Sequence, residues 1–350
     1  MTATRSQRLT YAAAQTARVA FYGAHYLAAR VLARDAFSTM EKLPHGIPSL
    51  RAMGKAMAAL FARDWENVQA GLYPMPVDIG ESLKRASNSL RYLTDVPRVV
   101  KRQKDHGHSD VPEGEADLPR YFRQNFHYQT GGYLSAESAK LYDFQVEALF
   151  GGTADAMRRR AFVPLAKHFD SKKRKAPPKI VDIAAGTGTF LSFVHGARPA
   201  WKLAALDLSK PYLARAKKRL GDAVEYIAAP AEKMPLKDAS VDAAVSIYLF
   251  HELPPKIRTA AAKEIARVLK PGGIFVLADT IQYGDVEGFD GLLDAFPQLL
   301  HEPYYSTYAK TDLEKLFGGA GLKRVETDIA YLTKVAVFAK PGARRTAHRA

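Results

Sequence analysis

From residue 179 onward, short apolar runs alternate with segments of helical periodicity. The apolar runs have the length of buried strands: Lys179–Ile183, Leu203–Leu206, Val224–Ala228, Ala243–Ile247 and Ile274–Ala278. Between them, helical periodicity is clearest in Lys210–Leu220 and Pro255–Leu269. Because strands that alternate with helices pair in parallel, the pattern predicts a parallel sheet with helices on both faces.

The last two apolar runs break this alternation. Arg324–Ala330 and Thr333–Ala339 are separated by a short turn, which leaves no room for a crossover helix. The two runs are therefore expected to pair antiparallel. The predicted fold class is α/β, with a seven-stranded sheet that ends in an antiparallel hairpin and is preceded by a mostly helical N-terminal region.

The first 70 residues are rich in Ala, Leu, Arg and Met and poor in turn residues. They predict two or three helices, interrupted at Leu43–Pro48. The first helix has an apolar arc that includes Tyr22 and Tyr26, but Arg30 and Arg34 fall inside this arc. Both a packed helix and a membrane-surface helix remain open for this segment.

Prolines and polar residues divide the middle of the chain. Tyr73–Pro76 ends any helix, and His106–Asp117 is predicted to be an exposed loop. Helical periodicity resumes over Ser135–His168, before the basic, proline-ended connector Ser171–Pro178. We therefore divide the chain into four parts: a helical N-terminal extension (residues 1–120), a helical cap with a basic linker (121–178), the α/β domain (179–340) and a basic tail (341–350).

Composition excludes several kinds of chemistry. The chain of 350 residues has no cysteine, which excludes disulfides, cysteine-ligated zinc or iron–sulfur clusters and a thiol nucleophile. Its most apolar N-terminal stretch, Val19–Ala29, has 11 residues, whereas a membrane span needs about 20. We expect a cytoplasmic protein without a membrane span.

Charge is unevenly spread along the chain. The formal net charge is +15, and residues 1–180 contain 28 Lys and Arg against 17 Asp and Glu, a net of +11. Such a balance favours acidic partners, which include nucleic acid, anionic lipid and acidic substrates. The basic N-terminal half is therefore a candidate for peripheral contact with a membrane surface.

The main chemical motif follows the first predicted strand. In Ile180–Phe190 an apolar strand runs into a turn with Gly186 and Gly188 and then into a helix. Glycine permits close backbone approach, and a helix N-terminus offers unpaired N–H groups, so the turn suits a nucleotide-like ligand. Asp207 ends the second strand, where an acid can bind both ribose hydroxyls. Leu191 stands where a dinucleotide fingerprint needs its third glycine, which argues against NAD.

Together with Asp182 and the terminal hairpin, these residues resemble the class I S-adenosyl-L-methionine (SAM)-dependent methyltransferases. Pro230–Asp242 and Ala266–Gly273 extend the resemblance, which covers residues 179–340. It is strongest toward the methyltransferases of ubiquinone and menaquinone biosynthesis and their small-molecule relatives, and it implies a Rossmann-like sheet. One departure is Pro230, where relatives usually place Asp or Asn beside the adenine amino group.

The resemblance implies SAM as the cofactor and assigns residues to it. The expected cofactor-binding residues lie at the ends of the first four strands: Asp182, Ala184, Ala185, Gly186, Thr187, Gly188, Asp207, Leu208, Ala231, Glu232 and Tyr248. Among them, Asp207 would bind the ribose, Leu208 would pack on the adenine, and Ala231 and Glu232 would border it. We assign no metal site.

Methyl transfer from a sulfonium is an in-line displacement, which requires alignment and exclusion of water. A base assists when the acceptor is a hydroxyl or an acidic carbon. His251, after the fourth strand, is the candidate base, and the alternative is that it caps the next helix. This segment lacks the Asn/Asp-Pro-Pro-aromatic motif of amide and adenine N-methyltransferases, which argues against DNA adenine as substrate.

Two further segments supply candidates. Tyr304 and Tyr305, in the insertion after the fifth strand, complete the catalytic candidates. The candidate substrate-binding residues are aromatic or imidazole side chains: Tyr128, Tyr133, Phe250, His301 and Tyr308. Ordinary packing is the alternative for each of these side chains. Arg158–Arg160 and Lys217–Arg219 are predicted to be solvated helix faces.

These observations predict a SAM-dependent methyltransferase that acts on a hydrophobic small molecule, such as a quinone, polyketide, aromatic or lipid. An RNA methyltransferase is one alternative, suggested by the basic N-terminal half. Nucleic acid is not our expected partner, because the chain has no recognised RNA-binding module. A non-catalytic scaffold subunit that keeps the fold is the other alternative. The sequence leaves the oligomeric state open.

Overall fold

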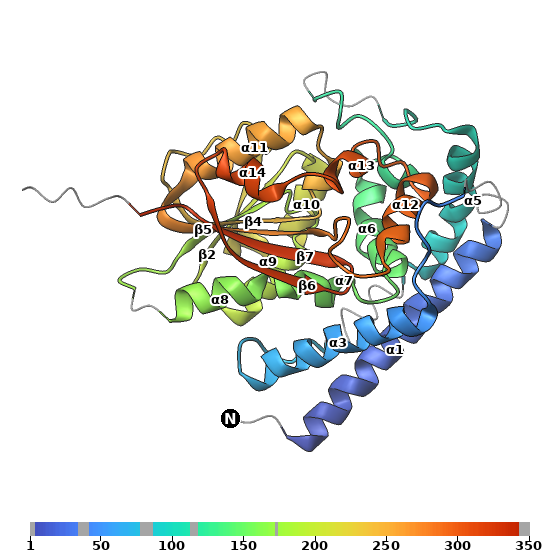
Figure 1. Ribbon diagram of the computed structural model, residues 1–350, viewed down its shortest axis with the longest axis horizontal. Helices are drawn as coiled ribbons and strands as arrows, with labels where there is room; N and C mark the ends of the chain where they lie inside the picture. Colours follow the sequence, from blue (N-terminus) through green and yellow to red (C-terminus); the bar gives the residue numbers. More distant parts are fainter. Residues whose placement is uncertain (1–3, 34–41, 78–86, 113–117, 172–173, 343–350) are drawn as a thin grey trace, which may run out of the picture.

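Seven strands form one sheet in the order β3-β2-β1-β4-β5-β7-β6 (Figure 1). The computed structural model describes residues 4–33, 42–77, 87–112, 118–171 and 174–342. The strands are β1 (Lys179–Ile183), β2 (Lys202–Asp207), β3 (Val224–Ala228), β4 (Val241–Ile247), β5 (Leu269–Thr280), β6 (Lys323–Ala330) and β7 (Thr333–Ala339). The first five pair in parallel, whereas β7 is antiparallel to both β5 and β6. The predicted parallel sheet with its terminal hairpin is confirmed.

Helices cover both faces of the sheet because its central strands are apolar on both sides. Alternate residues of β1 show this: Val181 and Ile183 pack toward α11 (Pro255–Val268) and α14 (Leu313–Gly318). Ile180 instead belongs to the opposite cluster, which includes residues of the helices that cover the other face: α8 (Phe162–Asp170), α9 (Thr189–Ala197) and α10 (Lys210–Leu220). The sheet thus positions the strand ends rigidly between two helical layers.

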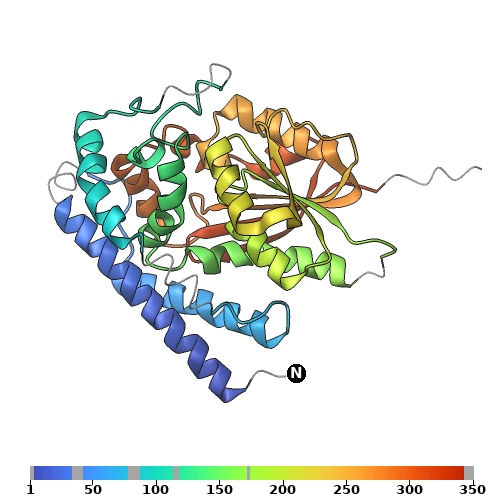
Figure 2. The ribbon, with the colours of Figure 1, turned by 180° about the vertical axis from the view of Figure 1, so that it is seen from behind.

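A separate group of helices lies beside the end of the sheet (Figures 1 and 2). It contains α1 (Arg5–Leu32), α3 (Leu50–Gln69), α5 (Ser89–Asp105), α6 (Ala136–Leu149), α7 (Ala154–Arg160), α12 (Asp290–Leu299) and α13 (Tyr305–Tyr308). The predicted helical N-terminal region is therefore confirmed, and Tyr73–Pro76 does follow the end of a helix. The fourfold division of the chain stays a prediction, and residues 343–350 of its basic tail lie outside the described residues.

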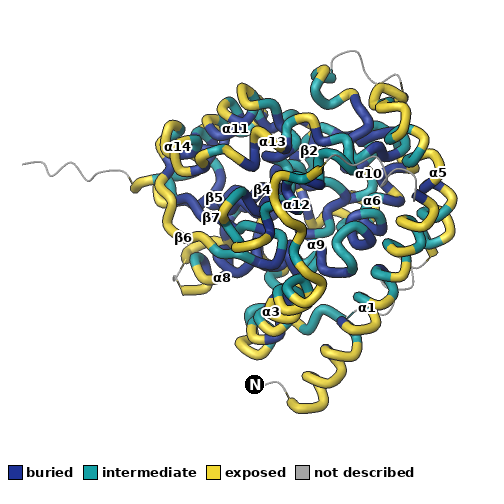
Figure 3. Tube along the Cα trace, turned by 45° about the vertical axis from the view of Figure 1, so that its right-hand side comes forward, coloured by how far each residue is buried: buried dark blue, intermediate teal, exposed yellow. Residues whose placement is uncertain are grey.

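The long helix α1 crosses the outside of this group, with much of its surface exposed (Figure 3). A capping box of Thr4 and Gln7 fixes its start. Tyr11 and Tyr22 are its buried aromatic residues, so the helix packs through a narrow stripe rather than a broad apolar face. No described helix combines the length and the apolar character that a membrane span requires.

The expectation that Arg158–Arg160 form a solvated face is wrong. All three arginines are buried, because other elements pack against α7 and a carboxylate pairs with each guanidinium. Their partners are Asp155 for Arg158, Asp64 for Arg159 and Asp328 for Arg160. The sequence shows that the three residues are charged, but it could not show which elements would pack against them.

Asp328 joins the helical group to the terminal hairpin. Its two carboxylate oxygens each accept a hydrogen bond from Arg63 of α3 at 2.6 Å, and Arg160 donates a third at 2.7 Å. These two arginines hold the pKa of Asp328 below its usual range, although its burial acts in the opposite direction. A residue of β6 thereby fixes both α3 and α7.

Candidate active site

The turn after β1 needs left-handed backbone at three positions. Ala184, Gly186 and Gly188 have φ angles of 60°, 56° and 74°. The two glycines serve different purposes. A Cβ on Gly188 would lie 3.0 Å from both Ala216 and Leu220 of α10, whereas the nearest neighbour of a Cβ on Gly186 is 4.0 Å away. Gly188 therefore permits α9 to pack on α10, and Gly186 leaves its side of the turn open to a ligand.

Asp207, at the end of β2, faces this turn. Its carboxylate accepts hydrogen bonds from the backbone N–H groups of Gly186 and Ser209, both at 2.7 Å. Burial raises the pKa of Asp207 to about 6, despite these two donors. Each carboxylate oxygen can accept a further hydrogen bond, so two hydroxyl groups of a ligand fit here.

Asp182 lies inside β1 and is almost entirely buried. Its Oδ1 has no hydrogen-bond partner among the described residues. Burial and the nearby Asp207 raise the pKa of Asp182 well above its usual range. An unpaired buried acceptor costs about 1–3 kcal/mol, so a bound polar group that donates to Asp182 would relieve this cost.

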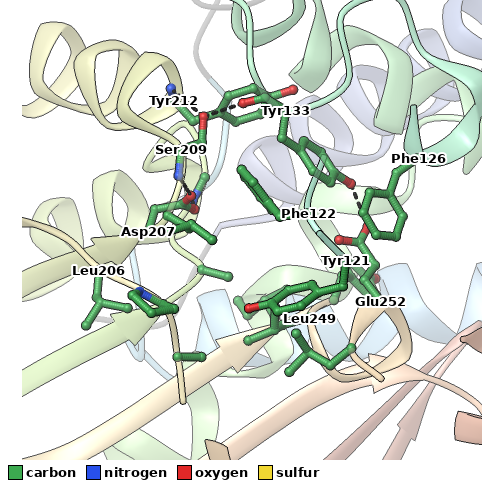
Figure 4. A pocket seen from close by; sticks show the side chains of 18 of the residues that line it. Tyr121, Phe122, Phe126, Tyr133, Leu206, Asp207, Ser209, Tyr212, Leu249 and Glu252 are labelled. Atoms are coloured by element: carbon green, nitrogen blue, oxygen red, sulfur yellow. Dashed lines mark hydrogen bonds between the residues drawn. The ribbon is translucent and has the colours of Figure 1, made fainter. Parts of the chain in front are cut away.

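Aromatic side chains close the space in front of these residues (Figure 4). We call this space, of about 730 Å³, the strand-end pocket. Its lining from the sheet side includes Ala184, Gly186, Asp207, Leu208, Ala231 and Tyr248, and its lining from the preceding cap is Tyr121, Phe122, Phe126, Tyr133 and Tyr142. The pocket combines an apolar, aromatic enclosure with the carboxylates of Asp207 and Glu252.

Hydrogen bonds fasten the aromatic residues of the cap to the strand ends. The Ser209 hydroxyl donates to the carbonyl of Tyr133 at 2.5 Å. The hydroxyl of the same tyrosine donates to Glu252 at 2.5 Å, and Tyr121 donates to Glu232 at 2.8 Å. The cap is thus attached beyond β2, β3 and β4.

Arg219 attaches α6 to the glycine turn. It forms an ion pair with Asp143 and donates to the carbonyl of Thr187 at 2.8 Å. Thr187 in turn donates to Asp143 at 2.7 Å. Lys217 and Lys218 are exposed as expected, but the expectation of a solvated face is wrong for Arg219, because α6 packs against the end of α10.

A second and larger space lies among the helices beside the sheet. This apolar cavity, of about 1820 Å³, is bounded by α1, α3, α5, α6, α12 and the turn between β6 and β7. Its apolar lining includes Met53, Met57, Val96, Val100, Leu299 and Leu332. Tyr142 lines both spaces, so the apolar cavity and the strand-end pocket share a wall.

His251 lines neither space, but it directly precedes Glu252, which lines the strand-end pocket. It is buried, and its Nδ1 makes a 2.6 Å hydrogen bond with Asp279. Burial alone would lower the pKa of His251, but the Asp279 carboxylate outweighs it and raises the pKa to about 9. His251 does not cap α11, because that helix begins after Pro254 without a side-chain cap. Of the two interpretations, helix capping is therefore excluded.

The domain family of the chain follows from its sequence and from this fold. Residues 181–277 match the family described as a methyltransferase domain. They span the glycine turn, Asp207 and the parallel strands that carry the strand-end pocket. This part of the chain therefore matches a methyltransferase domain.

Relatives match part of the chain. It is 30% identical over 163 residues to a Methylobacterium nodulans protein named ubiquinone/menaquinone biosynthesis C-methyltransferase, across 45% of this chain and 62% of that protein. It is 38% identical over 68 residues to a Caenorhabditis elegans sterol 4-C-methyltransferase, across 19% and 20% of the two chains. This chain thus spans less than two thirds of the length of these relatives.

A solved structure also matches the fold. It is the Burkholderia thailandensis 1,6-didemethyltoxoflavin-N1-methyltransferase with bound 1,6-didemethyltoxoflavin and S-adenosylhomocysteine. The match covers 59% of this chain and 88% of the other, with 20% identity and a TM-score of 0.41.

The cofactor of this methyltransferase domain is SAM, and the strand-end pocket fits it. The open side of Gly186 leaves room for the ligand, and Asp207 has free acceptor capacity for two ribose hydroxyls. Asp182, with its unpaired Oδ1, is buried and is not among the lining residues of the pocket. Pro230 and Ala231 line the pocket where the adenine is expected, so apolar contact replaces the usual polar side chain there.

The structure places the predicted cofactor residues in two groups. Ala184, Gly186, Asp207, Leu208, Ala231 and Tyr248 line the strand-end pocket. Asp182, Ala185, Thr187, Gly188 and Glu232 lie behind the lining, where they support it. Their individual roles toward SAM stay predictions.

Four of the five predicted substrate-binding residues lie outside the lining of both spaces. Phe250 and Tyr308 are fully buried in the core between the sheet and α11. His301 stacks on His108 with ring centres 4.5 Å apart, and Tyr128 is buried beside His301. None of these four is among the lining residues of either space, and all four are used in packing. Their roles toward a substrate stay predictions.

The tyrosines have separate positions. Tyr133 lines the strand-end pocket rather than the apolar cavity. Tyr304 packs with the aromatic residues of the cap. Tyr305 is buried with its ring centre 5.8 Å from that of His251.

Sequence reasoning missed residues whose partners are distant in the chain. Tyr142 gave no sign of its position between the two spaces, because it lies in an ordinary helical pattern. The crowding of aromatic residues after Leu118 was visible and could have identified Tyr121, Phe122 and Phe126. His127 and Glu302 lie beside His251 but have no local motif around them.

Proposed function

We propose that this protein transfers a methyl group from SAM to a hydrophobic small molecule held in the apolar cavity. The observation that carries the proposal is the shared wall at Tyr142 between that cavity and the strand-end pocket. A donor and an acceptor in adjoining, water-poor spaces have the arrangement that an in-line displacement requires.

The chemistry needs little from the protein beyond alignment. SAM supplies a sulfonium methyl group, whose carbon–sulfur bond breaks with its electron pair left on sulfur as the acceptor forms the new bond. Asp207 and the glycine turn hold the cofactor, and the aromatic cap excludes water from it. The proton that the acceptor loses passes to a basic group or to solvent.

The size and lining of the cavity favour a bulky apolar acceptor. The 1820 Å³ includes space open to solvent; without that space the cavity has a volume of about 450 Å³, within the roughly 300–1,000 Å³ typical of drug-sized ligands. The names of the two relatives refer to ubiquinone, menaquinone and sterols, which are apolar molecules. A quinone, lipid, polyketide or aromatic is therefore the proposed acceptor class.

We also propose that an anionic membrane surface is a partner of the N-terminal half. The end of α1 contributes Tyr26 and Arg30 to the cavity wall, while Leu27 and Val31 are 62% and 74% exposed. Apolar side chains beside a cavity mouth, in a region with a net charge of +11, suit a protein that receives its substrate from a lipid surface.

A cavity-filling variant tests the acceptor proposal. Val100→Trp on α5 should fill the apolar cavity and lower methyl transfer to lipid extracts by at least about tenfold, which corresponds to about 1.4 kcal/mol. Its affinity for SAM in calorimetry should stay unchanged. Leu90→Trp is the matched control, because this residue of the same helix is 72% exposed.

Three outcomes would contradict the proposal. If labelled methyl groups enter RNA but no lipid fraction, the RNA methyltransferase alternative holds. If the folded protein binds no SAM, the scaffold alternative holds. If Val100→Trp and Leu90→Trp transfer methyl groups equally well, the cavity does not hold the acceptor.

A further inference from the structure

Four ligand-type side chains meet between the two spaces. We call His127, His251, Glu252 and Glu302 the imidazole–carboxylate cluster. One nitrogen or oxygen atom from each lies within 4.8 Å of the others. The residues come from three separate segments: the turn Phe126–Tyr128, the turn Phe250–Glu252 and the connection between α12 and α13. Because the four residues lie in separate segments, helical or strand periodicity does not account for their meeting at one point.

The cluster contains a buried carboxylate with an unpaired oxygen. The side chain of Glu302 is fully buried. It makes a close ion contact with His127 Nε2, but neither of its oxygens has a hydrogen-bond partner among the described residues. A buried carboxylate costs several kcal/mol unless it is paired and hydrogen-bonded. His127 pairs with one oxygen of this carboxylate, and the other oxygen is left without a partner among the described residues.

Surrounding groups orient the cluster. The hydrogen bond from His251 Nδ1 to Asp279 directs Nε2 toward Glu252, whose Oε1 lies 4.0 Å away. Asp279 is itself fixed by the backbone N–H groups of Phe250 and Thr280, both at 2.8 Å. A carboxylate that holds the far nitrogen of an imidazole is the usual support of a metal-ligating histidine.

We propose that the imidazole–carboxylate cluster binds a divalent transition-metal cation. Two imidazole nitrogens and two carboxylates are a ligand set that suits Zn²⁺, Mn²⁺ or Fe²⁺. His127 Nε2 and Glu252 Oε1 are 3.8 Å apart, close enough for one cation to contact both. The ligands lose their protons when the cation binds, and no electron transfer is involved.

The position of the cluster gives the cation a role. His127 lines the apolar cavity, and Glu252 lines the strand-end pocket. A cation between them would contact a polar group of the acceptor beside the methyl donor. This role beside the acceptor rests on the proposed function, whereas the binding of the cation does not. The proposal makes His251 a ligand, in place of the base that the sequence suggested.

Metal analysis of the full-length protein tests the site directly. The protein is treated with a chelator, dialysed against Zn²⁺ or Mn²⁺, and analysed for metal content and by calorimetry. One cation per chain is expected. Glu302→Gln and His127→Gln should each weaken binding by at least about tenfold, because each removes one ligand. His45→Gln is the control, because His45 pairs with Asp294 at 2.8 Å outside the cluster.

SAM calorimetry on the same samples shows that the variants remain folded. Unchanged SAM affinity with lost cation binding supports the proposal. If the wild-type protein binds neither Zn²⁺ nor Mn²⁺, or if Glu302→Gln binds them as tightly as wild type, the proposal is overturned. The cluster would then be a metal-free group of carboxylates and imidazoles that share protons. Cation binding is measured without any acceptor, so its failure is distinguishable from failure of the proposed function.

Discussion

At the scale of single residues, the surroundings of Asp207 affect its protonation in opposite directions. Burial favours its neutral form, with a pKa of about 6, whereas the backbone N–H groups of Ser209, Gly186 and Leu208 favour the carboxylate. Ribose hydroxyls, as donors, bind best to the ionised form. Binding of the cofactor should therefore favour ionisation of Asp207, and ionisation of Asp207 should favour binding of the cofactor.

This coupling predicts a pH dependence of SAM affinity. Below pH 6 Asp207 is protonated in the free protein and must lose its proton on binding, so affinity should fall by up to about tenfold per pH unit. Calorimetry between pH 5 and pH 8 measures this directly. A flat affinity over that range would contradict the assignment. Asp207→Asn should bind about 10–100-fold more weakly at pH 7.5, because a hydrogen bond to a charged group is worth about 1.5–3 kcal/mol.

A second prediction concerns the buried ion pair of Arg159 and Asp64. Asp64 accepts hydrogen bonds from Arg159, Tyr11 and Tyr73 and is fully buried. Arg159→Met should lower the free energy of unfolding by about 3–5 kcal/mol, because it leaves the Asp64 charge buried and uncompensated. Urea denaturation measures the loss. Lys217→Met, at an exposed position, should change stability by less than about 0.5 kcal/mol.

At the scale of elements, the glycine turn separates packing from binding. Gly188 is required by the close approach of α9 to α10, whereas Gly186 faces the strand-end pocket. The neighbouring Ala184 already has a φ of 60°, so this turn tolerates a Cβ in the left-handed region at one position.

Two alanine substitutions should therefore mainly affect different properties, one the stability of the fold and the other the affinity for SAM. Gly188→Ala should destabilise the fold by about 1–3 kcal/mol, from backbone strain and from overlap with Ala216 and Leu220. Gly186→Ala should cost less stability but more SAM affinity. Thermal unfolding and calorimetry on both variants separate the two effects. Equal losses in both measurements would show that the turn acts as one unit.

The elements also show how far sequence reasoning reaches. Strands β1, β2, β4 and β5 were predictable, because a strand buried on both faces has a continuous apolar run. Asp207 was predictable from its spacing to the glycine turn. The imidazole–carboxylate cluster was not, because His127 and Glu302 are far apart in sequence and each has ordinary neighbours. Arg159 was misinterpreted for the same reason: its partner Asp64 lies on another helix.

At the scale of the whole molecule, basic charge and exposed apolar side chains occur in the same half of the chain. Residues 1–180 have a net charge of +11, and α1 exposes Leu27 and Val31 beside the apolar cavity. An electrostatic contribution to membrane binding weakens with salt, whereas an apolar contribution does not.

Vesicle binding tests this combination. The full-length protein should sediment with phosphatidylglycerol vesicles more than with phosphatidylcholine vesicles, and added salt should reduce this difference. Val31→Glu should weaken binding, because it adds a negative charge at the proposed contact. Val325→Glu, at a 60% exposed position on β6, is the matched control. Equal binding by both variants would remove α1 from the contact.

The position of Asp328 on β6 has a consequence for synthesis of the protein. The helices α3 and α7 depend on Asp328 for their arginine contacts, and α3 also packs on Tyr331 in the next turn. A ribosome adds Asp328 to the chain 265 residues after Arg63 and 168 residues after Arg160. The earliest helices should therefore stay incompletely packed during translation, with apolar surface open to chaperones until the hairpin arrives.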